Sequence, residues 1–458
     1  MTEALNFIRG NREKYLQELN ALLSIPSISS DPNRQEDTAA CAQHVAELLR
    51  KSGIKEVTVV PTAGHPVVFG NHIVDPKLPT ALIYGHYDVQ PVDPLELWEQ
   101  DPFKAHIKND RIIARGSADD KGQILMHCKA IEALNHSPRG IPLNLKIIFE
   151  GEEEIGSPNL VKFLSDHRAE LKADVALVSD TGMWGEGIPA ITYGLRGLAY
   201  LELELTGPNR DLHSGTYGGV VANPAEILAR LLAGVKDAKG RIQIPGFYDK
   251  VRTLSESERT ELNKVPFDIV EYRRDLGVAE LWGEEPYNPI ERAWIRPTFE
   301  INGIYGGFTG VGAKTVLPSK AAAKISMRLV PDQDPAEIAA LVEQYFRTEA
   351  PKSVQVKLTR HHGGKPLVVP LDNPFMSAAA LSLKEAFGTE PLFIREGGSI
   401  PICADFKELL GLDTILVGFA LPDARTHSPN ENLHLPSFFI GIESLVRMYC
   451  HFAENKPE

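Results

Sequence analysis

The chain has 458 residues, 43% of them hydrophobic and 24% charged, with a net charge of −13. It is globular in composition and too long for one ordinary core, so we expect two domains. The charge argues against a nucleic-acid surface, and no apolar run approaches the roughly 18 residues of a membrane helix. The first residues lack a signal core, so we expect a cytoplasmic protein with reduced thiols at Cys41, Cys128, Cys403 and Cys450.

The first part of the chain alternates helices with strands. Apolar residues recur at helical spacing over 4–23 and 36–52, and Gly53 stands where a helix C-cap belongs. Further helices are expected over 121–135 and 158–167, and strands over 55–60, 66–69, 80–84, 111–114, 143–149 and 174–178. The alternation predicts an α/β layered domain with a mostly parallel sheet, whose active residues gather at the carboxyl ends of strands.

The pattern changes at about residue 196. Residues 198–205 alternate apolar with polar side chains, which is typical of a strand with one wet face. Strands over 322–330 and 353–359 and helices over 223–235 and 335–348 complete an α+β portion. After 366 the α/β pattern returns, with helices over 373–387 and 436–451 and strands over 391–394 and 414–418. The simplest interpretation is one α/β domain, 1–195 and 365–458, interrupted by an inserted α+β domain, 196–364.

Five clusters of acids or histidines follow apolar runs or precede the last helix. They contain His86 with Asp88, Asp119 with Asp120, the acids from Glu150 to Glu154, Asp180, and His427. Along an extended chain His86 and Asp88 point the same way, so that the carboxylate can orient a metal-binding imidazole. Together the clusters supply two histidines and at least three carboxylates, a nitrogen and oxygen set that suits a paired site for zinc, manganese or cobalt.

Each cluster also has an ordinary structural explanation. Asp119 or Asp120 can cap the helix at 121–135, Asp180 can belong to a plain turn, and His427 can lie in a loop that caps the last helix. The glutamates can form an exposed acidic loop. Against that alternative, consecutive acids after a buried strand raise one another's pKa unless a cation is present.

The motifs GHYDVQPV, ARGSADDKG, EGEEEIGS, SDTGM, DLHSG, KTVLP, REGGSIP and THSPNE occur in this order. As a set they resemble the M20 family of metallopeptidases, in particular its branch of cytosolic nonspecific dipeptidases and carnosinases. The resemblance spans nearly the whole chain. It implies a catalytic domain with two bridged metal ions and an inserted lid domain through which relatives form homodimers.

The resemblance also assigns roles by position. His86 and Asp180 should bind one metal, Glu154 and His427 the other, and Asp119 should bridge the two, with a cis peptide bond after it. In the same way Asp88 should brace His86, and Glu153 should act as general base on a hydroxide held between the metals. Glu152 has no assigned role and is either a supporting residue or solvated.

In the lid, the resemblance implies that His213 reaches the active site of a partner subunit and that Arg328 holds the carboxylate of the substrate. Thr315, His362 and Ser399 match further substrate contacts. Without the resemblance, His213 would be read as an ordinary loop histidine and Arg328 as a solvated surface residue.

The implied activity is hydrolysis of the peptide bond of short unblocked peptides by a dipeptidase with two divalent ions, zinc first and manganese or cobalt as alternatives. Another M20 amidase, such as an N-acyl or N-succinyl amino acid deacylase or a carboxypeptidase, shares the same metal motifs. A non-catalytic binding protein would have lost a ligand or the base, and all are present. A serine hydrolase is excluded because the chain has no G-x-S-x-G motif.

Overall fold

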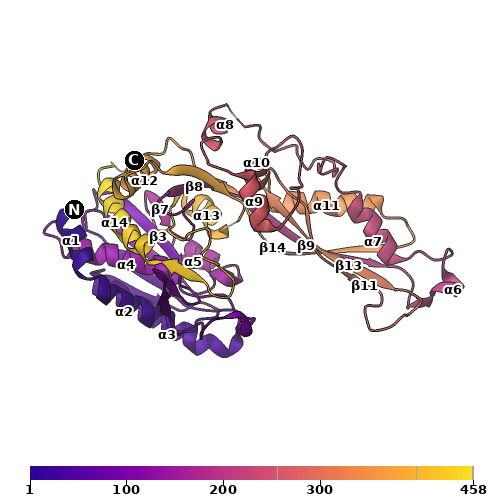
Figure 1. Ribbon diagram of the computed structural model, residues 1–458, viewed down its shortest axis with the longest axis horizontal. Coiled ribbons are helices and arrows are strands. Elements are labelled where there is room, and N and C mark those ends of the chain that lie inside the picture. Colours follow the sequence, from indigo (N-terminus) through magenta and orange to yellow (C-terminus); the bar gives the residue numbers. More distant parts are fainter. Residues whose placement is uncertain (255, 399, 456–458) are drawn as a thin grey trace. The chain divides into compact units, whose positions relative to one another are not determined.

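The computed structural model describes residues 1–254, 256–398 and 400–455, and the chain divides into two compact units (Figure 1). Unit 1 comprises residues 1–193, 369–394 and the chain from Asp405 onward; unit 2 comprises residues 194–368 and 395–404. The boundaries drawn from sequence, 196–364, fall inside unit 2. Residues 395–404 join unit 2 through bonds that periodicity cannot reveal, such as the one from Arg395 to Glu258 at 2.8 Å.

The large sheet, to which unit 1 contributes most of the strands, has the strand order β1-β2-β6-β3-β7-β17-β8-β15. The four central strands, β6, β3, β7 and β17, pair in parallel, and the pairings on both sides of them are antiparallel. The α/β class is confirmed, and the sheet is mixed. Its strands are Glu56–Val60 (β1), Val67–His72 (β2), Thr80–His86 (β3), Asn144–Glu150 (β6), Val175–Val178 (β7), Ala190–Leu195 (β8), Leu367–Val368 (β15) and Thr414–Leu416 (β17), with Leu392–Glu396 (β16) paired to β8.

Helices cover this sheet, and one of them, α4, is buried along almost its whole length. α4 (Lys121–Asn135) contacts β3 and packs against α3 (Gln35–Ser52) and α14 (Leu435–Phe452). The other helices are Thr2–Gly10 (α1), Arg12–Leu23 (α2), Leu160–Asp166 (α5) and Pro374–Phe387 (α12). The expected helix over 4–23 is broken at Asn11, and α3 ends at Gly53 with φ of 103°, the left-handed conformation that favours glycine.

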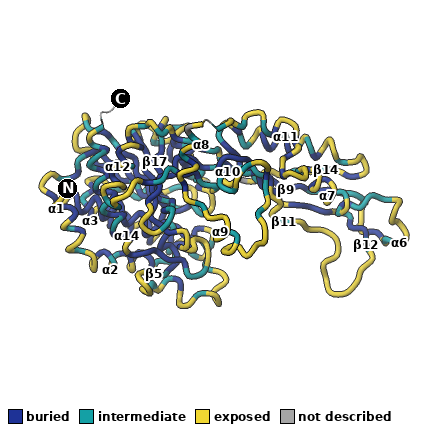
Figure 2. Tube along the Cα trace, turned by 45° about the horizontal axis from the view of Figure 1, so that its top comes forward, coloured by how far each residue is buried: buried dark blue, intermediate teal, exposed yellow. Residues whose placement is uncertain are grey.

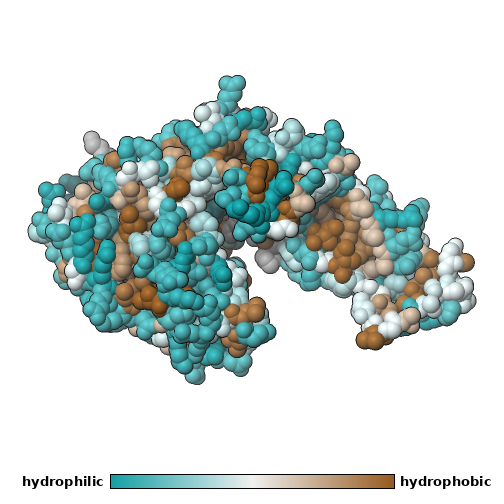
Figure 3. Space-filling view, in the orientation of Figure 1, coloured by the Kyte–Doolittle hydropathy of each residue, from teal (hydrophilic) through white to brown (hydrophobic). Residues whose placement is uncertain are grey.

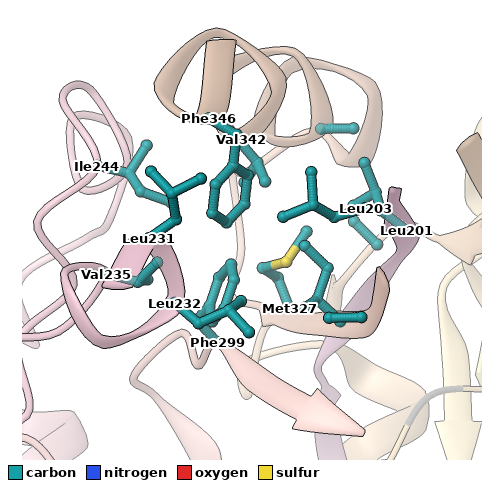
Figure 4. Close-up of a cluster of buried hydrophobic side chains, with 14 of the residues drawn as sticks. Leu201, Leu203, Leu231, Leu232, Val235, Ile244, Phe299, Met327, Val342 and Phe346 are labelled. Atoms are coloured by element: carbon teal, nitrogen blue, oxygen red, sulfur yellow. The ribbon is translucent and has the colours of Figure 1, made fainter. Parts of the chain in front are cut away.

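Unit 2 is built on a four-stranded antiparallel sheet in the order β11-β13-β9-β14. Its strands are Gly197–Thr206 (β9), Glu300–Gly306 (β11), Lys320–Leu329 (β13) and Gln355–Gly364 (β14). Residues of β9 alternate between buried and half-buried, as the sequence predicted. Two helices, α7 (Pro224–Ala233) and α11 (Pro335–Glu349), close the core, in which Leu203, Leu232 and Phe346 meet (Figure 4).

The remaining elements are short, and all but β5 were not expected from sequence. They are the strands His106–Lys108 (β4), Arg111–Ile113 (β5), Leu212–His213 (β10), Val316–Leu317 (β12) and Asn432–His434 (β18), and the helices Ser214–Tyr217 (α6), Glu256–Leu262 (α8), Ile269–Leu276 (α9), Pro289–Trp294 (α10) and Pro401–Asp405 (α13). Of these, only β5 lies where the sequence predicted a strand. Buried stretches are concentrated in the longer elements of each unit (Figure 2). No described helix combines the length and apolar character needed to cross a bilayer.

Candidate metal centre

The carboxyl ends of three neighbouring parallel strands carry the first residues of the site. His86 ends β3, Glu150 ends β6, and Asp180 lies two residues beyond the end of β7. β3 pairs with both β6 and β7, so these ends meet at one edge of the sheet. The register therefore brings together residues that are far apart in sequence.

Asp119 lies between two histidines from opposite ends of the chain. Its Oδ1 is 3.0 Å from Nε2 of His86, and its Oδ2 is 2.9 Å from Nε2 of His427. The imidazole of His86 is also 3.9 Å from Oδ2 of Asp180, and that of His427 is 3.3 Å from Oε2 of Glu154. One carboxylate thus offers one oxygen to each of two groups of possible metal ligands: His86, Asp119 and Asp180, and Asp119, Glu154 and His427.

The donor atoms fit a pair of divalent cations. Within each group the possible ligand atoms all lie within 4.8 Å of one another, and imidazole nitrogens with carboxylate oxygens are ligands that zinc and manganese accept. Three carboxylates crowded into one partly buried space repel one another unless positive charge joins them. The composition of this pocket is therefore that of a cation site.

The same crowding shifts the pKa values of the groups in the pocket. Burial, reinforced by the carboxylate of Asp119, raises the pKa of Asp180 well above its usual range. Burial lowers the pKa of His86, but Asp119, Asp88 and Asp180 outweigh it and raise the pKa well above the usual value. Hydrogen bonds to Asp119 and Glu154 raise the pKa of His427 to about 10. Without cations, protons would balance the charge of this pocket.

Asp88 supports both His86 and the acidic loop. Its carboxylate oxygens accept hydrogen bonds from the backbone N–H groups of Glu153 at 3.2 Å and Glu154 at 3.1 Å. One of these oxygens also lies 3.4 Å from Nδ1 of His86. The side chain of Gln90 donates to Oε2 of Glu154 at 2.7 Å. Asp88 therefore fixes the loop of Glu153 relative to the histidine.

Glu153 begins a single 3-10 turn, Glu153–Ile155. Burial, reinforced by the nearby carboxylates of Glu154 and Asp119, raises the pKa of Glu153 to about 7. A carboxylate with a pKa near neutrality can both take up and release a proton during a reaction. Its neighbour Glu152 is buried and accepts from the backbone of His65 and the side chain of Asn159, so it holds the loop in place.

The structural alternatives for two clusters do not hold. Asp120 stands at the N-cap of α4, but its side chain makes no capping bond and accepts from the backbone N–H of His86 at 3.1 Å. The last helix, α14, has His434 as its N-cap residue, so the His427 loop does not cap it. The peptide bond between Asp119 and Asp120 is cis, as expected.

Glu431 is a supporting residue to which neither its position in the sequence nor the family resemblance assigned a role. Its fully buried carboxylate forms an ion pair with Arg115 at 2.7 Å and accepts from the backbone N–H groups of Gly116, Ala118 and Asp119. The only signal in the sequence was its place in THSPNE. Glu431 ties the loop of the shared carboxylate to the loop that carries His427.

The His427 loop holds several residues in a conformation that non-glycine residues seldom adopt. Arg425, His427 and Asn430 have φ values of 57°, 58° and 63°. Each such residue costs about 1 kcal/mol or more, so the surrounding contacts must impose the conformation. Asn430 provides two of them, accepting from the N–H of Glu99 and donating to the carbonyl of Leu97.

Four of the residues predicted to contact substrate belong to unit 2. His213 and Thr315 are neighbours there, because the strand of His213 (β10) pairs with β12 and the N–H of Ser214 donates to the carbonyl of Thr315. Arg328 lies half-buried in β13, and burial lowers its pKa. His362 lies in β14, and Ser399 lies outside the described residues.

The sequence and the fold of the chain are similar to those of known proteins. Residues 82–451 match the family model described as Peptidase family M20/M25/M40. Cys-Gly metallodipeptidase DUG1 of Candida albicans is 33% identical, over 96% of this chain and 95% of that protein. Beta-Ala-His dipeptidase of Homo sapiens is 29% identical, over 99% and 93%. The crystal structure of Sso-CP2, an M20 family metallo-carboxypeptidase from Sulfolobus solfataricus, matches with a TM-score of 0.88 and 34% identity, over 96% of this chain and 99% of that one.

Proposed function

The chain belongs to peptidase family M20/M25/M40 and is a hydrolase, and from this premise we propose that it is a dipeptidase that uses two metal ions on short unblocked peptides. The observation that carries the proposal is the position of Asp119, whose two carboxylate oxygens lie 3.0 Å and 2.9 Å from the imidazoles of His86 and His427. A carboxylate shared in this way is what a two-metal hydrolytic site requires.

His86, Asp119 and Asp180 would hold one cation, and Asp119, Glu154 and His427 the other. Zinc suits these nitrogen and oxygen donors best, with manganese or cobalt as alternatives. When bound, such cations polarise the peptide carbonyl and lower the pKa of water to about 7.

Glu153 is the proposed general base. Its carboxylate takes a proton from the attacking water, the water oxygen bonds to the carbonyl carbon, and the bond from that carbon to nitrogen breaks. Glu153 then gives its proton to the departing amine. Glu153→Gln should retain both cations and lose turnover by several orders of magnitude. Unchanged turnover in this variant would remove Glu153 as the base.

His213 is proposed to donate a hydrogen bond to the oxygen on which negative charge develops. Its Nδ1 accepts the backbone N–H of Gly215 at 3.0 Å, so a neutral ring carries its proton on Nε2. The side chain is exposed on unit 2, which leaves that N–H able to reach a ligand. Arg328 is proposed to bind the substrate carboxylate through the planar fork of its guanidinium. Thr315, His362 and Ser399 are proposed as further substrate contacts.

A homodimer is proposed through unit 2. β11 lies at an edge of the four-stranded sheet, and its Ile301, Ile304 and Tyr305 are exposed. Apolar side chains gather on the surface of this unit (Figure 3). An exposed apolar edge strand favours pairing with another chain. If His213 acts across the dimer, mixing His213→Ala with Glu153→Ala chains should restore some activity, and mixed dimers without activity would contradict this.

The proposed substrate class distinguishes a dipeptidase from the other amidases of the family. Two of the relatives named above are called dipeptidases, whereas the Sso-CP2 structure is named a metallo-carboxypeptidase. The metal-loaded enzyme should be assayed on free dipeptides, tripeptides, and N-acetyl and N-succinyl amino acids, with Glu153→Gln as the control for contaminating activity. Free dipeptides should be hydrolysed fastest. Preference for blocked substrates would overturn the substrate class and leave the metal centre intact.

A cytoplasmic location is part of the proposal. All four cysteines are free thiols, and three of them are buried. Free thiols persist in reducing compartments.

A further inference from the structure

Two polar residues on the buried helix α4 point at the loop that carries Asp180. Gln123 and His127 are four residues apart, so they lie on one face of the helix, one above the other. Both are buried, and neither belongs to the proposed metal ligands. Polar side chains in such a position are expected to be hydrogen-bonded.

Gln123 joins three separate segments of the chain. Its side-chain N–H groups donate to the carbonyl of Ala118 at 3.0 Å and to the carbonyl of Thr181 at 3.3 Å. Its side-chain oxygen accepts from the backbone N–H of Phe419 at 2.8 Å. Ala118 precedes Asp119, and Thr181 follows Asp180. One amide therefore sets the spacing between the backbones that carry two of the proposed ligands.

His127 lies between a tyrosine and a serine. Its Nδ1 is 2.7 Å from the hydroxyl of Tyr449 on α14, and its Nε2 is 2.8 Å from the hydroxyl of Ser179. Burial lowers the pKa of His127 to about 3, so the ring is neutral and each nitrogen can serve one hydroxyl. Ser179 directly precedes Asp180. The chain from Tyr449 through His127 to Ser179 fixes the residue before Asp180, as Gln123 fixes the residue after it.

Backbone atoms also pack closely on the Asp180 loop. The N–H of Thr181 donates to the carbonyl of Ser179, which makes a tight turn at Asp180. A Cβ atom on Gly418 would lie 1.8 Å from the carbonyl oxygen of Thr181, so only glycine fits there. These backbone contacts therefore add to those that Gln123 and His127 make with the Asp180 loop.

We propose that Gln123 and His127 are positioning residues that set Asp180 against Asp119, and thereby set the affinity of the group His86, Asp119 and Asp180 for its cation. The inference rests on the proposed two-metal function. The cation affinity of one of the two sites would thus depend on side chains of α4. Outer residues that orient metal ligands typically contribute about 10- to 100-fold to metal affinity.

His127 allows a matched pair of substitutions. In His127→Gln the side-chain amide reaches the place of Nε2, so it keeps the bond to Ser179 and loses the one to Tyr449. In His127→Asn the amide reaches only the place of Nδ1, so it keeps Tyr449 and loses Ser179. Both variants bury one amide and leave one hydroxyl without its former partner, so their effects on folding should be similar.

The experiment is a titration of the metal-depleted full chain with Mn²⁺, with free Mn²⁺ followed by electron paramagnetic resonance. The unmodified chain should bind two ions. His127→Asn should weaken one of the two binding steps about tenfold or more, whereas His127→Gln should leave both steps close to those of the unmodified chain. The step weakened in His127→Asn should be the one missing in Asp180→Ala. Melting temperatures of the two His127 variants provide the control for a general structural effect.

Equal isotherms for the Asn and Gln variants would overturn the inference and leave the two-metal function standing. Weakening of a step that persists in Asp180→Ala would overturn it as well. Failure of the unmodified chain to bind Mn²⁺ would instead overturn the proposed function, and the inference with it.

Discussion

The carboxylate of Glu431 accepts a hydrogen bond of 3.1 Å from the backbone N–H of Asp119, 312 residues earlier in the chain. The same carboxylate also accepts hydrogen bonds from the backbone N–H groups of Gly116 and Ala118 and from the guanidinium of Arg115. Asp119 holds the central position between the two histidines. Its loop is therefore positioned by the C-terminal part of the chain, and both groups of possible metal ligands depend on this contact.

Glu431→Gln should destabilise the chain strongly. The substitution leaves Arg115 as a buried charge without its partner, and one amide N–H group would face backbone N–H donors. Breaking a buried ion pair in this way costs about 3–5 kcal/mol. Thermal unfolding of the metal-free chain measures the effect. The matched control is Asp166→Asn, which breaks the exposed pair with Lys162 and should cost less than about 1 kcal/mol. Equal effects of the two substitutions on the melting temperature would contradict the role of Glu431 in holding the Asp119 loop.

Glu150→Gln should stabilise the metal-free chain at pH 8 and leave it nearly unchanged near pH 5. Burial raises the pKa of Glu150 from 4.5 to about 8, while the hydroxyls of Tyr84 and Ser157 donate to its carboxyl. The folded state keeps the proton that the unfolded state releases, so stability is lost as the pH rises from 4.5 to about 8. Glutamine imitates the protonated form at every pH.

Melting temperatures across this pH range test the prediction for Glu150. The control is Glu99→Gln. A hydrogen bond from Lys108 lowers the pKa of the exposed Glu99, so this substitution should not stabilise the chain at pH 8. A difference between Glu150→Gln and the unmodified chain that stays constant from pH 5 to pH 8 would show that Glu150 is ionised in the fold.

Chelator should remove the two cations at different rates. The imidazole of His427 is 56% exposed and lies in the loop held by Asn430 and Glu431, whereas that of His86 is fully buried. The cation at the group of Asp119, Glu154 and His427 should therefore leave first. Release of zinc into a chromogenic chelator should show two phases, and His427→Ala should lack the fast one. A fast phase that survives this substitution would assign the labile cation to the other group.

The residues of the candidate metal centre were singled out because each of their clusters follows or precedes a recognisable element, and the family resemblance then implied their roles. His86 and Asp180 come after apolar strands, and Asp119 comes before α4, whose predicted bounds of 121–135 match the structure. The motif spacing then places each residue at the edge of the sheet. The roles of these residues stay predictions until a metal is bound.

The supporting contacts could not be read from the sequence. Glu431 reaches Asp119, and Gln123 reaches Phe419, across distances in sequence that depend on how the loops run in space. Periodicity also missed β11, because residues on both of its faces are exposed and it therefore shows no alternation. Whether Glu152 is a supporting residue or solvated could not be decided from the sequence, because its partners His65 and Asn159 become neighbours only in the fold.

The number of divalent ions bound per chain, measured by native mass spectrometry in Asp119→Ala and Glu153→Gln, tests the shared-carboxylate site most directly. Glu153→Gln should carry two ions and lack turnover, because the base is lost and every ligand remains. Asp119→Ala should lose tight binding of both ions at once, since each imidazole faces one of its oxygens. Retention of two tightly bound ions in Asp119→Ala would contradict the account.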